Sequence, residues 1–296
     1  MPAVAVIGLG AMGLPMAVRL IQAGFDVGGF DIGTAQLERF AAAGGRAATS
    51  PAEAARGASA IVIMTATGAQ AEAALFGEGG AAATATSGAL VLMCCTQSPA
   101  SAKATGERCA AAGLVALDAP VSGGVAGAEA GKLTFMLSGS EAALARAKPL
   151  LDHLAGRIYD VGREVGLGAT LKTINQLMAG THIVIAAEAL ALAAKAGLDP
   201  TMAKDALMSG AAGSWMLGNR GPRMLELDPE VASAVEIFVK DLGLVEDLAR
   251  SLRQPVPLAA AALQQFLAAS GMGHGRADDS QVVRVYETVS GARVRR

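Results

Sequence analysis

The chain has 296 residues, a formal net charge of −2 and 52% hydrophobic but only 3% aromatic residues. This length suffices for one large or two smaller domains, and the hydrophobic content excludes a disordered chain. Because no long basic run is present, neither nucleic acid nor an anionic membrane surface is an expected partner.

Cysteine and histidine are too sparse to build a structural site. The 3 cysteines form no disulfide framework and favour a reducing compartment, and the 3 histidines are far apart, so we predict no bound metal. The N-terminal segment lacks the basic residues of a secretory signal, and charged residues interrupt the later apolar segments. We therefore expect a soluble, cytoplasmic protein.

The chain begins with a strand, a turn, a helix and a second strand. Residues 3–7 form a short apolar run that is typical of a buried strand. Residues 11–23 carry apolar side chains at helical spacing, and Gly24 provides a stop for that helix. Residues 27–31 predict the second strand.

The alternation of strands and helices continues through the first half of the chain. A helix is expected over residues 34–43. Further strands are expected over the apolar runs at 60–64, 89–95, 115–117 and 133–137. This alternation predicts βαβ units and fades near residue 162, after which the chain is helical. We expect a Rossmann-type α/β domain with a mostly parallel sheet over 1–162 and an all-α domain over 163–296.

A glycine-rich turn separates the first strand from the first helix. Gly8, Gly10 and Gly13 have the spacing G-x-G-x-x-G. In this context the first glycine permits a tight turn, the second lets a pyrophosphate approach the backbone, and the third lets the helix pack closely on the strand. The helix N-terminus favours the phosphate charge. The pattern predicts a dinucleotide-binding turn, to which Ala11 and Met12 also belong.

An acidic residue stands where such domains recognise the adenosine ribose. Asp31 ends the second strand, 18 residues after Gly13, where a carboxylate accepts hydrogen bonds from the ribose hydroxyls. The same carboxylate repels the extra phosphate of NADP, and residues 32–34 contain no arginine that could hold it. The expected cofactor is therefore NAD rather than NADP.

A second glycine-rich segment extends from residue 118 to residue 139. Here Ser122 offers a hydroxyl, and the backbone N–H groups around Gly123 and Gly124 can form a nest for an anion. From the spacing alone, a site for a small carboxylate and an ordinary glycine-rich loop are equally open.

Four sequence blocks carry a resemblance to a known family: GLGAMGLPMA, DAPVSGG, GLGATLKTINQLM and FVKDLGLV. With these blocks in this order, the chain resembles the β-hydroxyacid dehydrogenases, which include 3-hydroxyisobutyrate dehydrogenase and tartronate semialdehyde reductase. The resemblance extends over nearly the whole chain. It implies a Rossmann-type N-terminal domain, a helical C-terminal domain and catalysis in the cleft between them.

The third block supplies the expected catalytic residue. A helix over residues 166–187 places one largely apolar face at Leu171, Ile174, Met178, Thr181 and Ile185. Lys172 and Asn175 lie on the opposite face and match the family's catalytic lysine and substrate-contacting asparagine; without the resemblance, a solvated surface lysine is the better interpretation. The resemblance implies that Lys172 is the general acid in reduction and the general base in oxidation, with its pKa lowered by desolvation. Asn175 would hold the substrate hydroxyl or carboxylate.

Further cofactor-binding residues follow from the resemblance and from the sheet edge. Lys240 matches a lysine that the family uses at the cofactor, with Asp241 beside it, although an ion pair with Glu236 on one helix face explains it equally from sequence. Thr65 and Thr96 follow predicted strands at the edge where ligands bind in such sheets. For Thr96, capping of the next helix is the alternative.

Three C-terminal segments resemble the L-threonate dehydrogenase subgroup: THIVIAAEALALA, AAGSWMLGNR and SAVEIFVKDLGLV. This resemblance makes His182, Trp215 and Asn219 candidate specificity residues in substrate binding. Core packing is an equal alternative for Trp215, the single tryptophan. The segment LGNRGPRM departs from the expected pattern and leaves the exact substrate open.

The expected activity is hydride transfer between NAD and the hydroxyl carbon of a small hydroxy acid, with a four-carbon sugar acid such as L-threonate favoured. The alternatives are a 3-hydroxyisobutyrate dehydrogenase and an NADPH-dependent tartronate or succinic semialdehyde or glyoxylate reductase, against which Asp31 argues. An imine reductase, and a non-catalytic scaffold of this fold, would be expected to lack Lys172. Apolar helices in the C-terminal half and the resemblance imply a homodimer or homotetramer.

Overall fold

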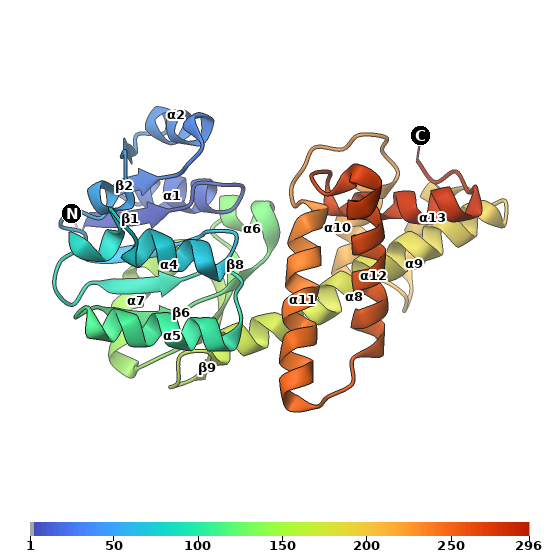
Figure 1. Cartoon of the computed structure of the whole chain (residues 1–296). Coiled ribbons are helices and arrows are strands. Elements are labelled where there is room, and N and C mark those ends of the chain that lie inside the picture. The colour runs from blue at the N-terminus through green and yellow to red at the C-terminus, as the bar shows by residue number, and fades with distance from the viewer. Residues whose placement is uncertain (1–2, 296) are drawn as a thin grey trace. The chain divides into compact units, whose positions relative to one another are not determined.

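The computed structural model describes residues 3–295 and divides into two compact units. One unit ends at Lys172 and the other begins at Thr173. Figure 1 shows a sheet flanked by helices in the first unit and a set of helices in the second. The sequence places the boundary at residue 162. In the structure, the start of helix α8 (Leu167–Lys195) belongs to the unit that contains the sheet.

The first unit is built on a sheet with the strand order β3-β2-β1-β4-β5-β6-β8-β7, and β9 pairs with β8. The strands are β1 (Ala3–Ile7), β2 (Asp26–Phe30), β3 (Arg46–Ala47), β4 (Ala60–Ile63), β5 (Leu90–Met93), β6 (Val115–Asp118), β7 (Val121–Ser122), β8 (Leu133–Ser138) and β9 (Ala155–Gly162). Pairing is parallel from β3 to β6 and between β8 and β9, and antiparallel where β8 meets β6 and β7. The predicted mostly parallel sheet of a Rossmann-type domain is confirmed.

Helices cover both faces of this sheet. They are α1 (Gly13–Gln22), α2 (Thr34–Ala42), α3 (Pro51–Ala54), α4 (Gly68–Phe76), η1 (Ala81–Ala83), α5 (Pro99–Ala111), α6 (Gly124–Glu129) and α7 (Glu141–Leu154). In β1, Val4 and Val6 join a core with α1, α2, α6 and α7, whereas Ala5 and Ile7 join a core with α3, α4 and α5. Because side chains alternate across a strand, a strand buried on both faces is apolar throughout.

The second unit is helical, as predicted. Beyond α8 it contains α9 (Pro200–Ser209), α10 (Trp215–Met224), α11 (Val235–Leu252), α12 (Pro257–Ala269), η2 (Ser270–His274), η3 (Asp279–Val282) and α13 (Val283–Ser290). Its core joins α8, α11 and α12: Leu190 and Leu242 are fully buried, and the rings of Phe238 and Phe266 stack at 5.1 Å. Dispersion contacts of this kind stabilise the unit without a sheet.

Helix α8 shows which of its faces packs against the protein. The apolar side chains of Ile174, Met178 and Ile185 are 50%, 54% and 54% exposed. The opposite face is the buried one: Lys172 and Gln176 are each 7% exposed, and Ile183 and Leu190 on the same face are fully buried. The expected apolar face is therefore real, but it does not pack on this chain.

Length and composition would also allow α8 to cross a membrane. Among the described residues it is the one helix that is long and apolar enough, yet 44% of its apolar window is buried inside the protein. A helix in the core of a soluble protein meets the same criteria.

Candidate active site

The glycine-rich turn after β1 has the geometry expected of a dinucleotide-binding turn. Gly8 has φ +94°, and a Cβ there would lie 2.5 Å from the Met64 carbonyl oxygen. A Cβ at Gly13 would lie 1.8 Å from the Gly8 carbonyl oxygen. Protein packing thus explains these two glycines. By contrast, a Cβ at Gly10 meets no atom within 4 Å, which leaves that position open for a ligand to approach.

Asp31 is held beside this turn at the end of β2. Its Oδ2 accepts a hydrogen bond from the Leu9 N–H at 2.7 Å, and its Oδ1 accepts one from the Gly33 N–H at 2.8 Å. Each carboxylate oxygen can accept a second hydrogen bond. The side chain is therefore fixed beside the glycine-rich turn, and its oxygens keep acceptor capacity for a further donor.

The two candidate threonines also follow parallel strands. Thr65 follows β4 and donates its hydroxyl to the Thr67 carbonyl oxygen at 3.0 Å. Thr96 follows β5, but Ser98 is the residue that caps α5, by accepting from the Ser101 N–H at 3.1 Å. The capping role considered for Thr96 is therefore wrong. The carboxyl ends of β1, β2, β4 and β5 meet at one edge of a parallel sheet, so the candidate cofactor residues of the first unit share that edge.

The segment that contains Ser122 forms a tight turn between β7 and α6. Gly123 has φ +131° and Gly124 has φ +63°, conformations that glycine adopts at little cost. Ser122 is the last residue of β7 and is half-buried. The turn geometry therefore accounts for both glycines without a ligand.

The start of α8 is bonded to the sheet through a buried carboxylate. Asp118, the last residue of β6, is 1% exposed, and its Oδ2 accepts from the N–H groups of Gly166 at 2.9 Å and Ala169 at 2.8 Å. Burial raises the pKa of Asp118 to about 6, while these hydrogen bonds act in the opposite direction. These bonds explain why the first turn of α8, up to Lys172, belongs to the first unit.

Asn175 and Lys240 are brought together in the second unit. The Asn175 side chain donates to Gln176 Oε1 at 2.8 Å, the Gln176 amide donates to the Asp241 carboxylate, and Lys240 Nζ lies 2.5 Å from Asp241 Oδ1. Asp241 is 2% exposed and is shared by both partners. The predicted orientation of Lys240 by its neighbour is therefore present, whereas the Glu236 carboxylate accepts from the Ser270 hydroxyl.

The candidate specificity residues on α10 cluster around one arginine. The Arg220 guanidinium lies 5.7 Å from the centre of the Trp215 ring, and its Nη1 donates to Asn219 Oδ1 at 2.8 Å. Trp215 is 55% exposed, so the core-packing interpretation of this tryptophan is wrong. His182 is half-buried on another helix, α8.

Sequence reasoning missed three contributors to these arrangements. Asp118 and Ser138 end neighbouring strands, and Arg220 is anchored by Asp279 through Nε–Oδ1 and Nη2–Oδ2 distances of 3.0 and 2.8 Å. For Asp118 a signal was available, since it is an acid at the carboxyl end of a predicted strand, as Asp31 is. Nothing in the spacing identifies the Arg220–Asp279 pair, whose members are 59 residues apart.

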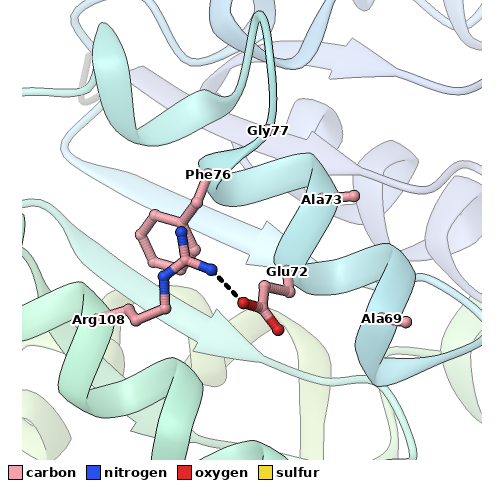
Figure 2. Close-up of a pocket in the computed structure, with 6 residues that line it drawn as sticks. All are labelled: Ala69, Glu72, Ala73, Phe76, Gly77 and Arg108. Carbon is pink, nitrogen blue, oxygen red and sulfur yellow. Dashed lines mark hydrogen bonds and ion pairs between the residues drawn. The ribbon is translucent and has the colours of Figure 1, made fainter.

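A pocket of about 310 Å³ lies elsewhere in the first unit, between α4 and α5. Figure 2 shows that Arg108 forms an ion pair with Glu72 and stacks on Phe76, with 4.3 Å between the guanidinium carbon and the ring centre. The pocket contains none of the predicted site residues. We therefore do not assign it to the candidate active site.

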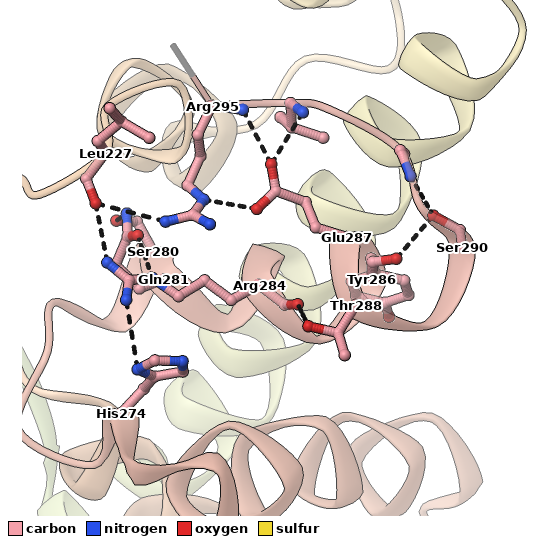
Figure 3. Close-up of polar contacts among 12 residues, drawn as sticks. Leu227, His274, Ser280, Gln281, Arg284, Tyr286, Glu287, Thr288, Ser290 and Arg295 are labelled. Carbon is pink, nitrogen blue, oxygen red and sulfur yellow. Dashed lines mark hydrogen bonds and ion pairs between the residues drawn. The ribbon is translucent and has the colours of Figure 1, made fainter.

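A polar network in the second unit also lies apart from the candidate residues. Figure 3 shows that Glu287 accepts from the Arg295 N–H group and that Arg284 donates to the Leu227 carbonyl oxygen, at 3.0 and 2.8 Å. Glu287 also accepts from the Val294 N–H group at 2.9 Å. These contacts fasten the segment after α13. Within residues 3–295 no group of three His, Cys, Asp or Glu side chains is arranged to hold a metal ion.

Comparisons with known proteins agree with this architecture. Residues 3–162 match the model of the NAD binding domain of 6-phosphogluconate dehydrogenase, and residues 166–286 match the NAD-binding model of NADP-dependent 3-hydroxyisobutyrate dehydrogenase. The chain is 46% identical over 283 residues to an L-threonate dehydrogenase of Cupriavidus necator, covering 96% of this chain and 95% of the relative. It is 44% identical over 288 residues to an L-threonate dehydrogenase of Haemophilus influenzae, covering 97% and 96%.

A solved structure shares the fold over the full length. The crystal structure described as 3-hydroxyisobutyrate dehydrogenase from Salmonella typhimurium has a TM-score of 0.92 and 42% sequence identity, covering 96% of this chain and 100% of the other. The family expected from the four sequence blocks is thereby confirmed, and with it an NAD(P)-binding enzyme. The chain belongs to the 3-hydroxyisobutyrate dehydrogenase-like family of NAD(P)-dependent β-hydroxyacid dehydrogenases.

Proposed function

We propose that the protein oxidises the hydroxyl carbon of L-threonate, or of a closely similar C4 sugar acid, with NAD as hydride acceptor. The observation that carries this proposal is a buried lysine at the family's catalytic position: Lys172 is 7% exposed on α8. The identity to L-threonate dehydrogenases supports the choice of substrate.

The residues at the sheet edge fit a dinucleotide. The open position at Gly10 admits a pyrophosphate to the start of α1, whose first N–H groups favour phosphate charge. Ala11 and Met12 complete that turn, and Thr65, Thr96 and Lys240 are further proposed cofactor contacts. NAD, when bound, supplies the carbon that accepts the hydride.

The chain's own residues handle the proton and the carboxylate. In oxidation, Lys172 Nζ takes the proton of the substrate hydroxyl while hydride leaves the carbon that bears this hydroxyl for NAD, and a carbonyl forms. In reduction, Lys172 returns the proton to the carbonyl oxygen. Asn175 binds the substrate hydroxyl or carboxylate, and the link through Gln176 orients its amide. Ser122 and the N–H groups near Gly123 hold the carboxylate.

The preference for NAD is assigned to Asp31. The Leu9 and Gly33 N–H groups hold its carboxylate in place, so it cannot easily turn away from a second negative group. A 2′-phosphate at the ribose would meet this charge at close range, which disfavours NADP. This argues against the NADPH-dependent semialdehyde or glyoxylate reductase considered above.

Substrate selection beyond the reacting carbon is proposed for His182, Trp215 and Asn219. Arg220 fixes the two residues on α10, because its guanidinium stacks near the Trp215 ring and bonds the Asn219 amide oxygen. An indole edge and an amide suit a polyhydroxylated acid, which presents both C–H faces and hydroxyl groups.

The test is a substrate panel with the purified full chain. Initial rates of NAD and NADP reduction are measured with L-threonate, D-erythronate, 3-hydroxyisobutyrate and glycerate. The proposal expects the highest kcat/KM for L-threonate or D-erythronate with NAD. Turnover of 3-hydroxyisobutyrate or glycerate alone would contradict the C4 sugar acid, and higher kcat/KM with NADP would contradict the role of Asp31.

We also propose a cytoplasmic homodimer or homotetramer. Ile174, Met178, Ile185 and Leu192 form an apolar stripe on α8, between 50% and 69% exposed, and such a stripe is typically covered by another chain. Three buried cysteines, none of them in a disulfide, agree with a reducing compartment. Light scattering coupled to size-exclusion chromatography tests the assembly, and a monomer at micromolar concentration would contradict it.

A further inference from the structure

The carboxylate of Asp118 connects two segments that are distant in sequence. Its Oδ2 accepts from Gly166 and Ala169, which are 48 and 51 residues further along the chain. The first N–H groups of a helix have no partner within that helix and need one elsewhere. A usual capping residue lies within a few residues of those N–H groups, whereas here the cap comes from the end of β6.

Ser138 extends this connection from the neighbouring strand. It is paired with Asp118 across β6 and β8, it donates its hydroxyl to Asp118 Oδ2 at 3.3 Å, and it accepts from the Gly168 N–H at 2.9 Å. Both side chains are buried, at 1% and 0% exposed. Two strands of the sheet therefore satisfy three N–H groups at the start of α8.

Close backbone contact holds the same turn against the sheet. A Cβ at Gly168 would lie 2.4 Å from the Met136 carbonyl oxygen and 3.1 Å from Asp118 Oδ2. Only a glycine allows this approach without displacing β8. The first turn of α8 is thus fixed by packing and by charged hydrogen bonds together, and charged hydrogen bonds are the stronger kind.

The position of Asp118 links this turn to the proposed chemistry. Lys172 lies three residues after Ala169 on α8, and Ser122 lies four residues after Asp118 on the same connection out of β6. A shift of the first helical turn would move Lys172 relative to the Ser122 segment. A displacement of about 1 Å at a catalytic group can lower a rate about 100-fold.

We propose that Asp118 is a positioning residue: together with Ser138 it fixes the first turn of α8 to the end of β6 and thereby places Lys172 relative to the Ser122–Gly124 segment. This inference rests on the proposed function, in which Lys172 moves the proton. It assigns Asp118 no contact with substrate or cofactor.

The test compares Asp118→Asn, Asp118→Ala and Ser138→Ala with the wild type at pH 8, using the best substrate of the panel. We expect kcat to fall about 10- to 100-fold in Asp118→Ala, with a smaller loss in Asp118→Asn, which keeps an acceptor oxygen. The Kd for NAD should stay within about twofold, because the proposed cofactor residues of the first unit follow other strands and Lys240 lies on α11. A role confined to stability would not produce this separation of kcat from NAD binding.

A matched control is available on α5. Thr105 is 1% exposed, and its hydroxyl has no hydrogen-bond partner in the described structure. Thr105→Val alters a buried polar group of the same unit without removing a hydrogen bond of the Asp118 connection, and it should leave kcat unchanged. If Asp118→Ala does not fold, the kcat values of Ser138→Ala and Asp118→Asn test the inference. Each of these variants keeps some of the hydrogen bonds between the sheet and the first turn of α8.

The outcomes separate this inference from the proposed function. Folded Asp118 and Ser138 variants with wild-type kcat, alongside an inactive Lys172→Ala, would overturn the positioning role alone. Full activity in Lys172→Ala would overturn the proposed function first. A reduced kcat with unchanged NAD binding in the Asp118 and Ser138 variants, but not in Thr105→Val, supports the inference.

Discussion

The Asp31 carboxylate accepts a hydrogen bond from the Leu9 N–H at 2.7 Å, which joins the end of β2 to the glycine-rich turn after β1. The carboxylate is thus part of the turn that the dinucleotide would occupy. In the proposed function, recognition of the ribose and recognition of the pyrophosphate would therefore depend on one local structure.

Replacement of Asp31 should change the cofactor preference. In Asp31→Ser, kcat/KM with NAD should fall about 10- to 100-fold, because hydrogen bonds to a charged group contribute about 1.5–3 kcal/mol. The value with NADP should fall less or rise, since the repelling charge is gone. Initial rates with both cofactors measure this, and an unchanged NAD-to-NADP ratio would contradict the assignment.

Two glycines of the turn should respond differently to alanine. Gly13→Ala places a Cβ 1.8 Å from the Gly8 carbonyl oxygen and should lower the melting temperature by several degrees. In Gly10→Ala the Cβ meets no protein atom, so the melting temperature should not fall while NAD binding weakens at least tenfold. Thermal unfolding and NAD titration separate the two effects. Equal destabilisation by both changes would be inconsistent with this geometry.

The free energy of unfolding should depend on pH through the titration of Asp118. Its pKa is raised from 3.8 to about 6 in the folded protein, so between these values the folded state binds more protons than the unfolded chain. The free energy of unfolding should therefore decrease by about 3 kcal/mol as pH rises from 4 to above 6, because one pKa unit corresponds to about 1.4 kcal/mol. The neighbouring Cys94 thiol, whose pKa burial also raises, stays protonated throughout.

Chemical denaturation of the wild type and Asp118→Asn at pH 4.5 and 7.5 measures this contribution. Relative to the wild type, the free energy of unfolding of Asp118→Asn should be higher at pH 7.5 than at pH 4.5. A difference that does not depend on pH would show that Asp118 titrates at its ordinary value.

Asp241 should stabilise the second unit because its carboxylate accepts from the Gln176 amide and pairs with the Lys240 ammonium group. Asp241→Ala leaves the Gln176 amide and the partly exposed Lys240 without this acceptor, and it should lower the free energy of unfolding by about 2 kcal/mol. In a double-mutant cycle with Lys240→Met, the second change should cost less in the Asp241→Ala background than alone. Strict additivity would indicate that the pair contributes nothing.

The sequence predicts those elements whose signal is local. The strand at 3–7, the turn with Gly8 and the helix that follows it are found as Ala3–Ile7 and Gly13–Gln22, because burial on both faces requires an apolar run and the turn requires glycine. Asp31 is predictable in the same way, because it is the acid at the carboxyl end of the second predicted strand. These features depend on neighbours in the chain, so their pattern is visible in it.

The features that were missed depend on contacts between distant segments. Strand β9 (Ala155–Gly162) is mostly exposed, and Arg157 and Asp160 interrupt its apolar residues, so it lacks the apolar run that marks the other strands. The antiparallel position of β8 beside β6 is set by pairing, which composition does not reveal. The periodicity of α8 indicates an apolar face, but it cannot tell which face packs on the chain, and the packed face is the opposite one, with Lys172, Gln176 and Leu190.

The measurement that most directly tests the account is the rate of NAD reduction by Lys172→Ala, with Lys195→Ala as the control. Lys195 is an exposed lysine at the far end of the same helix. With L-threonate we expect kcat to fall about 1000-fold in Lys172→Ala, as for loss of a general acid–base group, and to remain unchanged in Lys195→Ala. Retention of more than a tenth of the wild-type rate by a folded, NAD-binding Lys172→Ala would show that another group moves the proton.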